Sequence, residues 1–329
     1  IIFMVVFYGI NAVIGGFAFL DTPANAAGIA VVHSLFNIGA VLLLYPFGNQ
    51  LVKLAQFTIP EHADEKEQKP DEFAILDERF LEKPAFAMEL CKNATIKMAE
   101  EAKDALELSL ENLHTYDGKC VDKIIALEQS VDRYEDALGT YLVKLNNCDL
   151  SQNDSRTLSI LLHCIGNFER ISDHAVNITD SLTEMKEKDL HFSKKALEEM
   201  EVFSKALKDI VEATCTAFVE ADLGKARRIE PFEQVIDGLS IELKQRHVHR
   251  LRKGKCTIEL GLILEDIITN YERISDHCSN IAVCMIRVNE DGFDTHEYLD
   301  VVKEEKAPWF EEEFYALSKK YALPEKKRK

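Results

Sequence analysis

The sequence predicts an all-α protein in which two apolar helices are followed by six helices, arranged as two repeated three-helix bundles. Three observations lead to this fold class. Residues 1–52 carry a single charge, Asp21, whereas the rest of the 329-residue chain is rich in charged residues. From Pro84 to about Asn289 apolar residues recur at helical spacing, without strand-like alternation. Finally, the stretch 167–178 returns as 270–281 with nine of twelve positions identical, which indicates a duplication.

The composition limits the partners that the chain can have. Its formal net charge of −18 argues against nucleic acid and favours a metal ion or another cationic partner. The eight cysteines contain no Cys-x-x-Cys pair, so we expect free thiols in a reducing compartment. The sequence starts at Ile1 without a methionine or a basic leader, and we therefore expect a truncated N-terminus rather than a signal peptide.

Residues 1–55 contain the two apolar segments. Residues 1–20 are uncharged and long enough to span a bilayer, and a second uncharged run extends from Ala24 to Val52. Thr22 and Pro23 separate the two runs as an N-cap and a first helical residue. We therefore expect two transmembrane helices. A buried helical hairpin of a soluble protein is the alternative, but the length of both runs argues against it.

Asn25, His33 and Asn37 are the polar residues of interest in the second apolar segment. His33 and Asn37 are four residues apart and share one helix face. Polar side chains in a membrane helix usually face the bundle interior or a transport pathway. Hydrogen bonding between helices, without a role in transport, is the alternative interpretation.

The stretch from Thr22 to Asn37 combines an alanine-rich turn with the sequence His-x-x-Phe-Asn. It resembles the last membrane section of bacterial sodium/phosphate cotransporters. This resemblance implies a multi-pass protein of the bacterial cytoplasmic membrane, in contact with lipid, with inorganic phosphate as substrate and Na⁺ as coupling ion. The Gln-Ser-Ser hairpins of that family are absent from the chain, so its phosphate and sodium ligands would lie upstream of Ile1.

Residues 56–84 are predicted to form an acidic linker, because they are polar and interrupted by prolines. The stretch from Leu76 to Ala87 is similar to the junction that precedes the cytosolic domain in those cotransporters. Lys53 is the only cation close to the second apolar run, which weakly supports a cytosolic location for everything downstream. The free thiols agree with that side of the membrane.

Six helices are predicted downstream of the linker, at 85–114, 118–147, 155–187, 193–222, 224–251 and 257–289. The breaks between them carry suitable residues: the turn dipeptide Asp117-Gly118, N-cap candidates at 153–155, Ser193 and Thr257, and Gly254 after the fifth helix. Short connections favour antiparallel neighbours. Residues 85–187 then form one bundle and 193–290 a second, followed by a tail at 291–329.

Carboxylates recur at matched positions of the two repeats. On the third and sixth helices, Glu-x-x-x-Asp pairs fall beside the apolar face, so they line a groove or an open face of the bundle. The preceding helix of each repeat carries another pair. The eight candidate metal ligands are Glu128, Asp132, Glu169, Asp173, Glu233, Asp237, Glu272 and Asp276. Converging carboxylates repel one another unless a cation or proton intervenes, and oxygen-only ligand sets suit Mg²⁺, Mn²⁺ or iron.

A simpler interpretation of these acids is also open. Glu-x-x-x-Asp occurs on many solvated helices, and Arg170 and Arg273 could pair with the acids as surface salt bridges. His174 and His277 point about 100° away from the aspartates that precede them, so they are at best peripheral ligands. Gly238 and Pro231 flank the pair on the fifth helix, and glycine weakens a helix by about 1 kcal/mol. We therefore expect that pair to be the less well formed.

Two three-helix bundles with such pairs on their second and third helices resemble PhoU, the helical regulator of bacterial phosphate uptake. The resemblance implies divalent or iron metal ions at the eight positions and leaves a homodimer open. A cotransporter membrane domain followed by a PhoU-like domain is a known bacterial arrangement. Together the resemblances imply the C-terminal part of a sodium-dependent phosphate transporter with a regulatory domain. A membrane-anchored adaptor that docks on a separate transporter or kinase is the alternative.

No nucleophile paired with a base, phosphate-binding glycine loop or cofactor fingerprint is recognisable in the sequence, so we do not expect an enzyme. The tail contains one more amphipathic stretch, residues 309–321, which predicts a short helix. The basic end at 325–329 is interpreted either as a contact for anionic lipid or as a solvated terminus.

Overall fold

A computed structural model describes residues 75–289 and 308–325, together with residues 11–13, 30, 33–34, 37–39 and 41 near the N-terminus. The chain divides into two compact units, Ile1–Pro70 and Asp71–Lys329. Most of the two predicted membrane segments, including Asn25, and most of the predicted linker lie outside the described residues. Within the part of the chain that is described, no helix has the length and apolarity needed to cross a bilayer.

In the first unit, His33 and Asn37 lie in helical residues and are bonded to each other. The amide Nδ2 of Asn37 donates to Nε2 of His33 across 2.9 Å. The prediction that both side chains share one helix face is thus confirmed.

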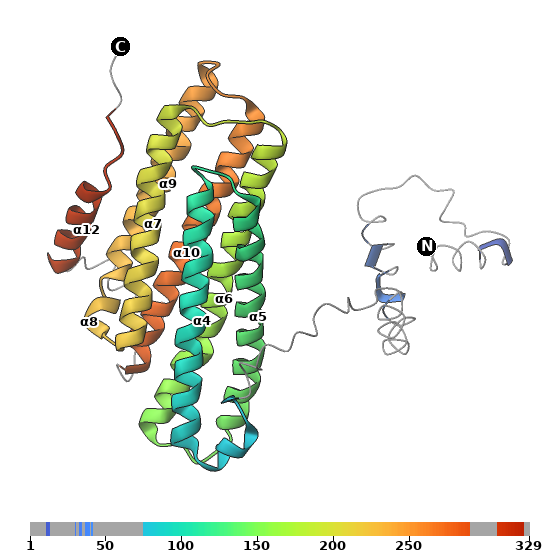
Figure 1. The fold of residues 1–329 in the computed structure, drawn as a ribbon, viewed down its shortest axis with the longest axis vertical. Helices are drawn as coiled ribbons and strands as arrows, with labels where there is room; N and C mark the ends of the chain where they lie inside the picture. The colour runs from blue at the N-terminus through green and yellow to red at the C-terminus, as the bar shows by residue number, and fades with distance from the viewer. Residues whose placement is uncertain are drawn as a thin grey trace. The chain divides into compact units, whose positions relative to one another are not determined.

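The described part of the second unit is all helical, as predicted (Figure 1). Its helices are α4 (Pro84–Asn112), α5 (Gly118–Leu145), α6 (Gln152–Glu187), α7 (Lys194–Glu220), α8 (Leu223–Ala226), α9 (Ile229–Arg252), α10 (Ile258–Asn289) and α12 (Pro308–Lys320), with a short 3-10 helix η5 (Glu78–Glu82) before them. Helices α4, α5 and α6 form bundle 1, and α7, α9 and α10 form bundle 2. The two bundles meet mainly where α6 packs against α10, so the helices that carry the duplicated stretch are central.

Local capping explains most helix boundaries. Ser193 accepts a hydrogen bond from the backbone of Ala196, and Thr257 accepts one from Leu260, so both predicted N-caps are confirmed. The prediction for the third helix was wrong by three residues, because Ser151 caps α6 by accepting from the backbone N–H of Asp154. Gly254 has a φ of +62° just after α9, a left-handed conformation that glycine adopts without strain.

The predicted fifth helix is instead two helices. Asp222 caps the short α8, and the chain breaks at Arg227 and Arg228 before α9 begins. Pro231 then falls in the first turn of α9, where its missing N–H has no partner to lose. The fifth helix was predicted as continuous because helical spacing does not reveal such a one-turn interruption.

One apolar core runs through both bundles. Phe168 of α6 packs edge-on against Phe218 of α7, with ring centroids 5.2 Å apart. Phe203 and Tyr271 form a similar pair inside bundle 2, where the buried Tyr271 hydroxyl is satisfied by Ser204 at 2.8 Å. Because aromatic contacts reach from one bundle into the other, the two bundles pack as one body.

Peripheral segments close the outer side of each bundle. In bundle 1 the hydroxyl of Tyr141 donates to the backbone oxygen of Asp77, just before η5, at 3.0 Å. In bundle 2 Arg246, which stands at the corresponding position of α9, donates to the backbone oxygen of Pro324 at 2.8 Å. The predicted tail helix is confirmed as α12, and it packs along α9 with Tyr321 stacked on Phe232.

Candidate metal centre

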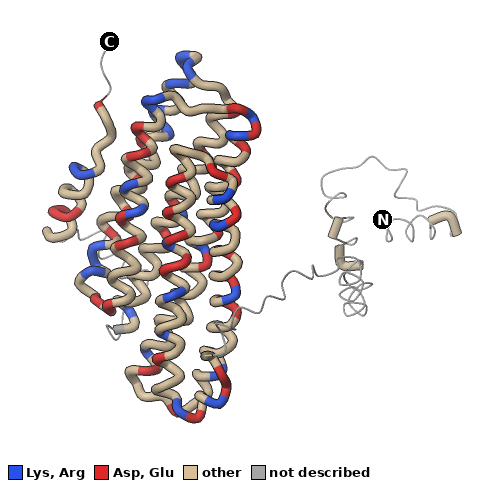
Figure 2. Tube along the Cα trace, in the orientation of Figure 1, with Lys and Arg blue, Asp and Glu red and all other residues tan. Residues whose placement is uncertain are grey.

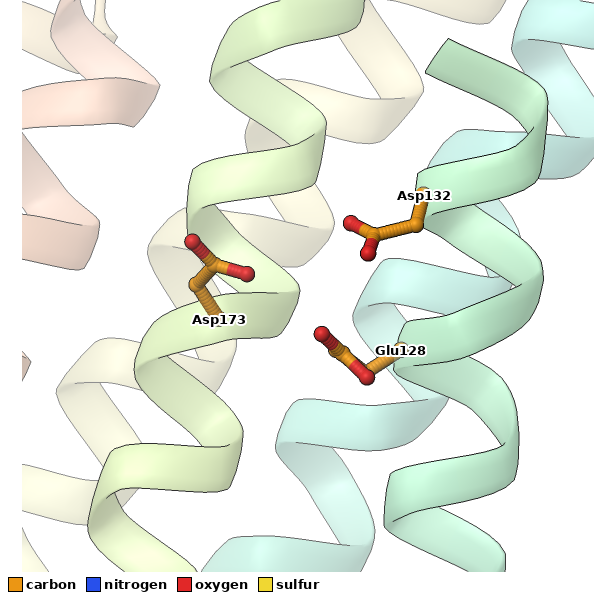
Figure 3. Close-up of side chains that lie close together, drawn as sticks. All are labelled: Glu128, Asp132 and Asp173. Carbon is orange, nitrogen blue, oxygen red and sulfur yellow. The ribbon is translucent and has the colours of Figure 1, made fainter. Parts of the chain in front are cut away.

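Three carboxylates converge in bundle 1, between α5 and α6. Glu128 and Asp132 lie one turn apart on α5, and Asp173 faces them from α6 (Figure 3). Each offers an oxygen atom, and these three atoms all lie within 4.8 Å of one another. A spacing of four residues on one helix, with a single acid on its antiparallel neighbour, therefore produces a compact three-oxygen cluster.

Bundle 2 repeats the arrangement. Glu233 and Asp237 on α9 converge with Asp276 on α10, again with their oxygen atoms within 4.8 Å of one another. Glu233 is buried, so this cluster lies deeper than the first. The expectation that Gly238 and Pro231 would leave this pair less well formed was wrong. Pro231 lies in the first turn of α9, where proline is tolerated, and the helix continues unbroken through Gly238.

The remaining two of the eight predicted ligands lie beside these clusters. Glu169 is on α6, one turn before Asp173, and forms an ion pair with Arg170 at 3.2 Å. Glu272 is at the equivalent place on α10 but has different neighbours. It accepts hydrogen bonds from Ser240 at 2.8 Å and from Lys244 at 3.3 Å, both on α9.

Burial and the neighbouring negative charges raise the pKa values of Glu128, Asp132 and Glu169 in bundle 1. Burial, followed by the charges of Asp132 and Asp173, raises the pKa of Glu128. Burial and the charge of Asp173 likewise raise the pKa of Asp132. The largest effect falls on Glu169, whose pKa is raised to about 7 by burial and by Asp173. Negative charge is therefore costly in this groove, and a bound cation would relieve that cost.

Arginines border both clusters, as the simpler interpretation of the acids predicts. Arg170 lies 3.2 Å from Asp173, and Arg273 lies 3.4 Å from Asp276. Both arginine side chains are at least 60 % exposed, and exposed ion pairs contribute only about 0–1 kcal/mol. A single arginine beside each cluster does not neutralise three converging carboxylates, so each cluster keeps a net negative charge.

His174 and His277 lie away from the clusters, in the seam between the bundles. Nδ1 of His174 donates to Oδ1 of Asn270 at 2.8 Å, and Nδ1 of His277 donates to Oδ1 of Asn167 at 3.0 Å. The two imidazole rings stack on each other with centroids 5.5 Å apart. The duplicated stretch thus has two structural roles: its aspartate joins a carboxylate cluster, while its asparagine and histidine join the two repeats.

The reciprocal asparagine–histidine bonds were not foreseen from the sequence, although a signal for them exists. Asparagine and histidine recur seven residues apart in both copies, and that spacing places them on one helix face. Ser240 and Lys244 were also missed. They have no repeated counterpart, because Glu135 and Gly139 stand at the corresponding positions of α5.

The two clusters fit a hard or borderline cation. Each supplies three carboxylate oxygens and no sulfur or imidazole ligand, which is the donor chemistry that suits Mg²⁺, Mn²⁺ and iron. Asp132 is exposed, which would leave positions for water around a cation bound at the first cluster. The fold and the site together define a helical protein of two repeated bundles, each with a cluster of three carboxylates on its second and third helices.

Comparison with known proteins identifies the family. A family model described as the PhoU domain matches residues 95–182 and 201–285, which together are more than half of the chain. The chain therefore belongs to the PhoU domain family. The first matched range falls on bundle 1 and the second on bundle 2. Each repeat inferred from the sequence therefore corresponds to one match of the family model.

Three relatives illustrate the likeness. The chain is 28% identical over 214 residues to the phosphate-specific transport system accessory protein PhoU homolog 1 of Thermotoga maritima, a match that covers 64% of this chain and 90% of that protein. The crystal structure of the phosphate transport system regulatory protein PhoU from Streptococcus pneumoniae aligns with a TM-score of 0.58 at 17% identity, covering 64% of this chain and 99% of the other. PhoU from Pseudomonas aeruginosa aligns with the same TM-score and identity, covering 62% and 97%. At this identity the solved structures show the shared fold.

Proposed function

We propose that the second unit is a regulator of phosphate transport whose state depends on cations bound in its two grooves. The observation that carries this proposal is the same cluster of three carboxylates in both bundles. Relatives named as an accessory protein and a regulatory protein of phosphate transport support the process. The role is regulatory rather than catalytic, and each groove would hold a divalent cation or iron with Glu128, Asp132 and Asp173, or Glu233, Asp237 and Asp276.

We further propose that residues 1–55 are the last membrane section of a sodium-dependent phosphate transporter and that the second unit regulates it from the cytosolic side. The stretch from Thr22 to Asn37 supports this proposal through its resemblance to sodium/phosphate cotransporters. In this arrangement Na⁺ and inorganic phosphate bind upstream, and the grooves report the cation state of the cell to the membrane part.

Metal analysis of the purified chain tests the cation grooves. We expect the wild-type chain to retain Mn²⁺ or iron stoichiometrically after desalting. Asp173→Ala should remove the metal of bundle 1, and Asp276→Ala that of bundle 2, because each variant deletes the only α6 or α10 ligand of its cluster. Asp180→Ala, on an exposed residue of α6 two turns further on, is the control. Equal metal content in all four proteins would refute the assignment.

Uptake of labelled phosphate tests the regulatory role. In cells that carry the gene in place of its wild-type copy, the double variant Asp173→Ala/Asp276→Ala should change phosphate uptake, while the control variant should not. If both grooves lose their metal and uptake is unaltered at every phosphate concentration, the grooves have a structural role instead.

A further inference from the structure

The end of bundle 2, where α9 turns into α10, is basic and carries exposed aliphatic side chains in a chain whose net charge is −18. Figure 2 shows Lys and Arg gathered at this turn, at one end of the unit. From Leu243 to Leu264 the sequence contains six Lys or Arg residues and a single acid, Glu259. That acid forms an ion pair at 2.9 Å with Lys188, which also pairs with Glu184 at 2.7 Å.

Three of these cations are available to a partner. Arg252, Lys253 and Lys255 are exposed in the turn, whereas Arg246 and Arg250 are held by the buried carboxylate of Glu199. The free cations stand within one turn of the α9 C-terminus, where their charge is also favourable for the helix. Stabilisation of the α9 C-terminus therefore explains some of the cations in this turn. It does not explain the exposed aliphatic residues that follow them in the sequence.

The aliphatic residues are among the most exposed of their kind in the described chain. Ile258 and Leu262, one turn apart at the start of α10, are 77% and 62% exposed, and Val248 of α9 is 44% exposed. Ile258 and Leu262 share one face by their spacing. Placing two large aliphatic side chains in water beside three cations is unfavourable for a free surface.

The duplication supplies an internal comparison. At the positions of Ile258 and Leu262, the first repeat has Ser155 and Ser159. The connection between α5 and α6, residues 146–151, contains no Lys or Arg, and it reads Asn-Asn-Cys-Asp-Leu-Ser. The equivalent end of bundle 1 thus has two serines in place of the aliphatic pair, and its connection contains an acid, Asp149, and no cation. Neither the cations nor the exposed aliphatic pair of bundle 2 are required by helix packing.

We propose that the α9–α10 turn of bundle 2 is a docking surface for a membrane that contains anionic lipids. Arg252, Lys253 and Lys255 would contact lipid phosphates, while Ile258 and Leu262 enter the boundary between headgroups and acyl chains. An exposed turn with two aliphatic side chains and three cations nearby in the sequence matches an interface of this kind. A protein partner would instead need a broad surface of about 800 Å² on each side.

Vesicle binding by residues 71–329 tests the proposal, with the apolar residues 1–52 removed so that they cannot insert. Such a fragment corresponds to whole chains of known fold, since the two solved relatives align over 99% and 97% of their length. We expect cosedimentation with phosphatidylcholine vesicles that contain 30 mol% phosphatidylglycerol, and little with phosphatidylcholine alone. Binding should persist in EDTA, which separates this surface from the cation grooves.

Two double variants distinguish lipid insertion from simple charge attraction. Lys253→Gln/Lys255→Gln should weaken binding about 25-fold, since each cation near an anionic surface contributes about fivefold. Ile258→Ser/Leu262→Ser, which copies the first repeat, should weaken it about tenfold or more because two aliphatic side chains no longer insert. Val143→Ser changes an exposed valine at the equivalent place in bundle 1 and should have no effect.

Three outcomes would overturn the proposal: no binding to anionic vesicles by the wild type, equal binding to both kinds of vesicle, or binding that survives the serine double variant. The last outcome, with loss in the lysine variant, would indicate simple charge attraction to the anionic vesicle without insertion of Ile258 and Leu262. In the complete chain, amide hydrogen exchange across residues 248–262 should slow with anionic vesicles and not with neutral ones. Unchanged exchange would sink the proposal independently of the fragment.

Discussion

Replacing Glu169 by Gln should flatten the dependence of stability on pH in the metal-free protein. Burial and the neighbouring charge of Asp173 raise the pKa of Glu169 to about 7, from the ordinary value of 4.5. When the pKa of a carboxyl group is higher in the folded chain than in the unfolded chain, the folded state holds the proton more tightly. Its contribution to stability is then lost as pH rises through the folded pKa. The amide of Gln does not titrate, so the variant has no such loss.

The size of the effect follows from the two pKa values. Relative to the fully ionised state, protonation of Glu169 stabilises the fold by about 1.4 kcal/mol at pH 6 and about 0.1 kcal/mol at pH 8. The free energy of unfolding should therefore fall by about 1.3 kcal/mol more in the wild type than in the variant over this interval. The side chain is only 18% exposed, so solvent screening reduces this figure little. In a unit of this size the difference corresponds to roughly 3–5 °C in Tm.

Thermal unfolding followed by circular dichroism at pH 6, 7 and 8 in EDTA measures the difference. His174 and His277 titrate with the opposite sign, because burial lowers their pKa values and stability rises with pH up to about 6.5. Comparing each variant with the wild type at the same pH cancels that contribution. Glu272→Gln is the matched control, since it makes the same change beside Lys244 in bundle 2. The reasoning is refuted if Glu169→Gln keeps the wild-type slope or if both variants flatten it equally.

Two further predictions concern the interior of the unit. Glu199→Ala should cost about 3–5 kcal/mol in urea unfolding, because it leaves two largely buried arginines without their carboxylate. Glu78→Ala, which breaks an exposed ion pair, should cost less than about 1 kcal/mol, and similar costs for both variants would contradict the assigned burial. Asn167→Ala should cost about 1–2 kcal/mol, since His277 loses its partner in the seam. In a double-mutant cycle with His277→Ala the two costs should not add, and full additivity would show that the bond contributes nothing.

The six long helices could be predicted because their signals are local. Helical spacing of apolar residues, together with caps such as Ser193 and Thr257, fixes most helix ends within about three residues. The interruption at Arg227 and Arg228 was missed because it has no local signal in the sequence. It depends on how α8 and α9 pack against α7 and α10, and no proline or glycine marks the break itself.

The sequence predicted which acids belong to the candidate site, but only partly which of them converge. Spacing along each helix and the duplication select all eight acids. Which of them converge depends on the rotation of each helix about its axis, and that rotation is set by packing of the core. The structure consequently brings Asp173 to the cluster and leaves Glu169 one turn away. Lys244 reaches Glu272 from a neighbouring helix, a contact that no spacing within one helix can reveal.

The two repeats separate what the fold requires from what each groove adds. Both keep the three-carboxylate cluster and the asparagine–histidine seam, so these features belong to the shared architecture. Around Glu272, however, Ser240 and Lys244 provide a hydroxyl and a positive charge, where α5 has Glu135 and Gly139. One lysine offsets one carboxylate, and attraction for a cation grows with the net negative charge of its site. If the clusters bind cations as proposed, the cluster of bundle 1 would attract a divalent cation more strongly, and the cluster of bundle 2, with Lys244 already beside Glu272, would fill at a higher cation concentration. Two sites with unequal affinities would then respond over a wider range of cation concentrations than two identical sites.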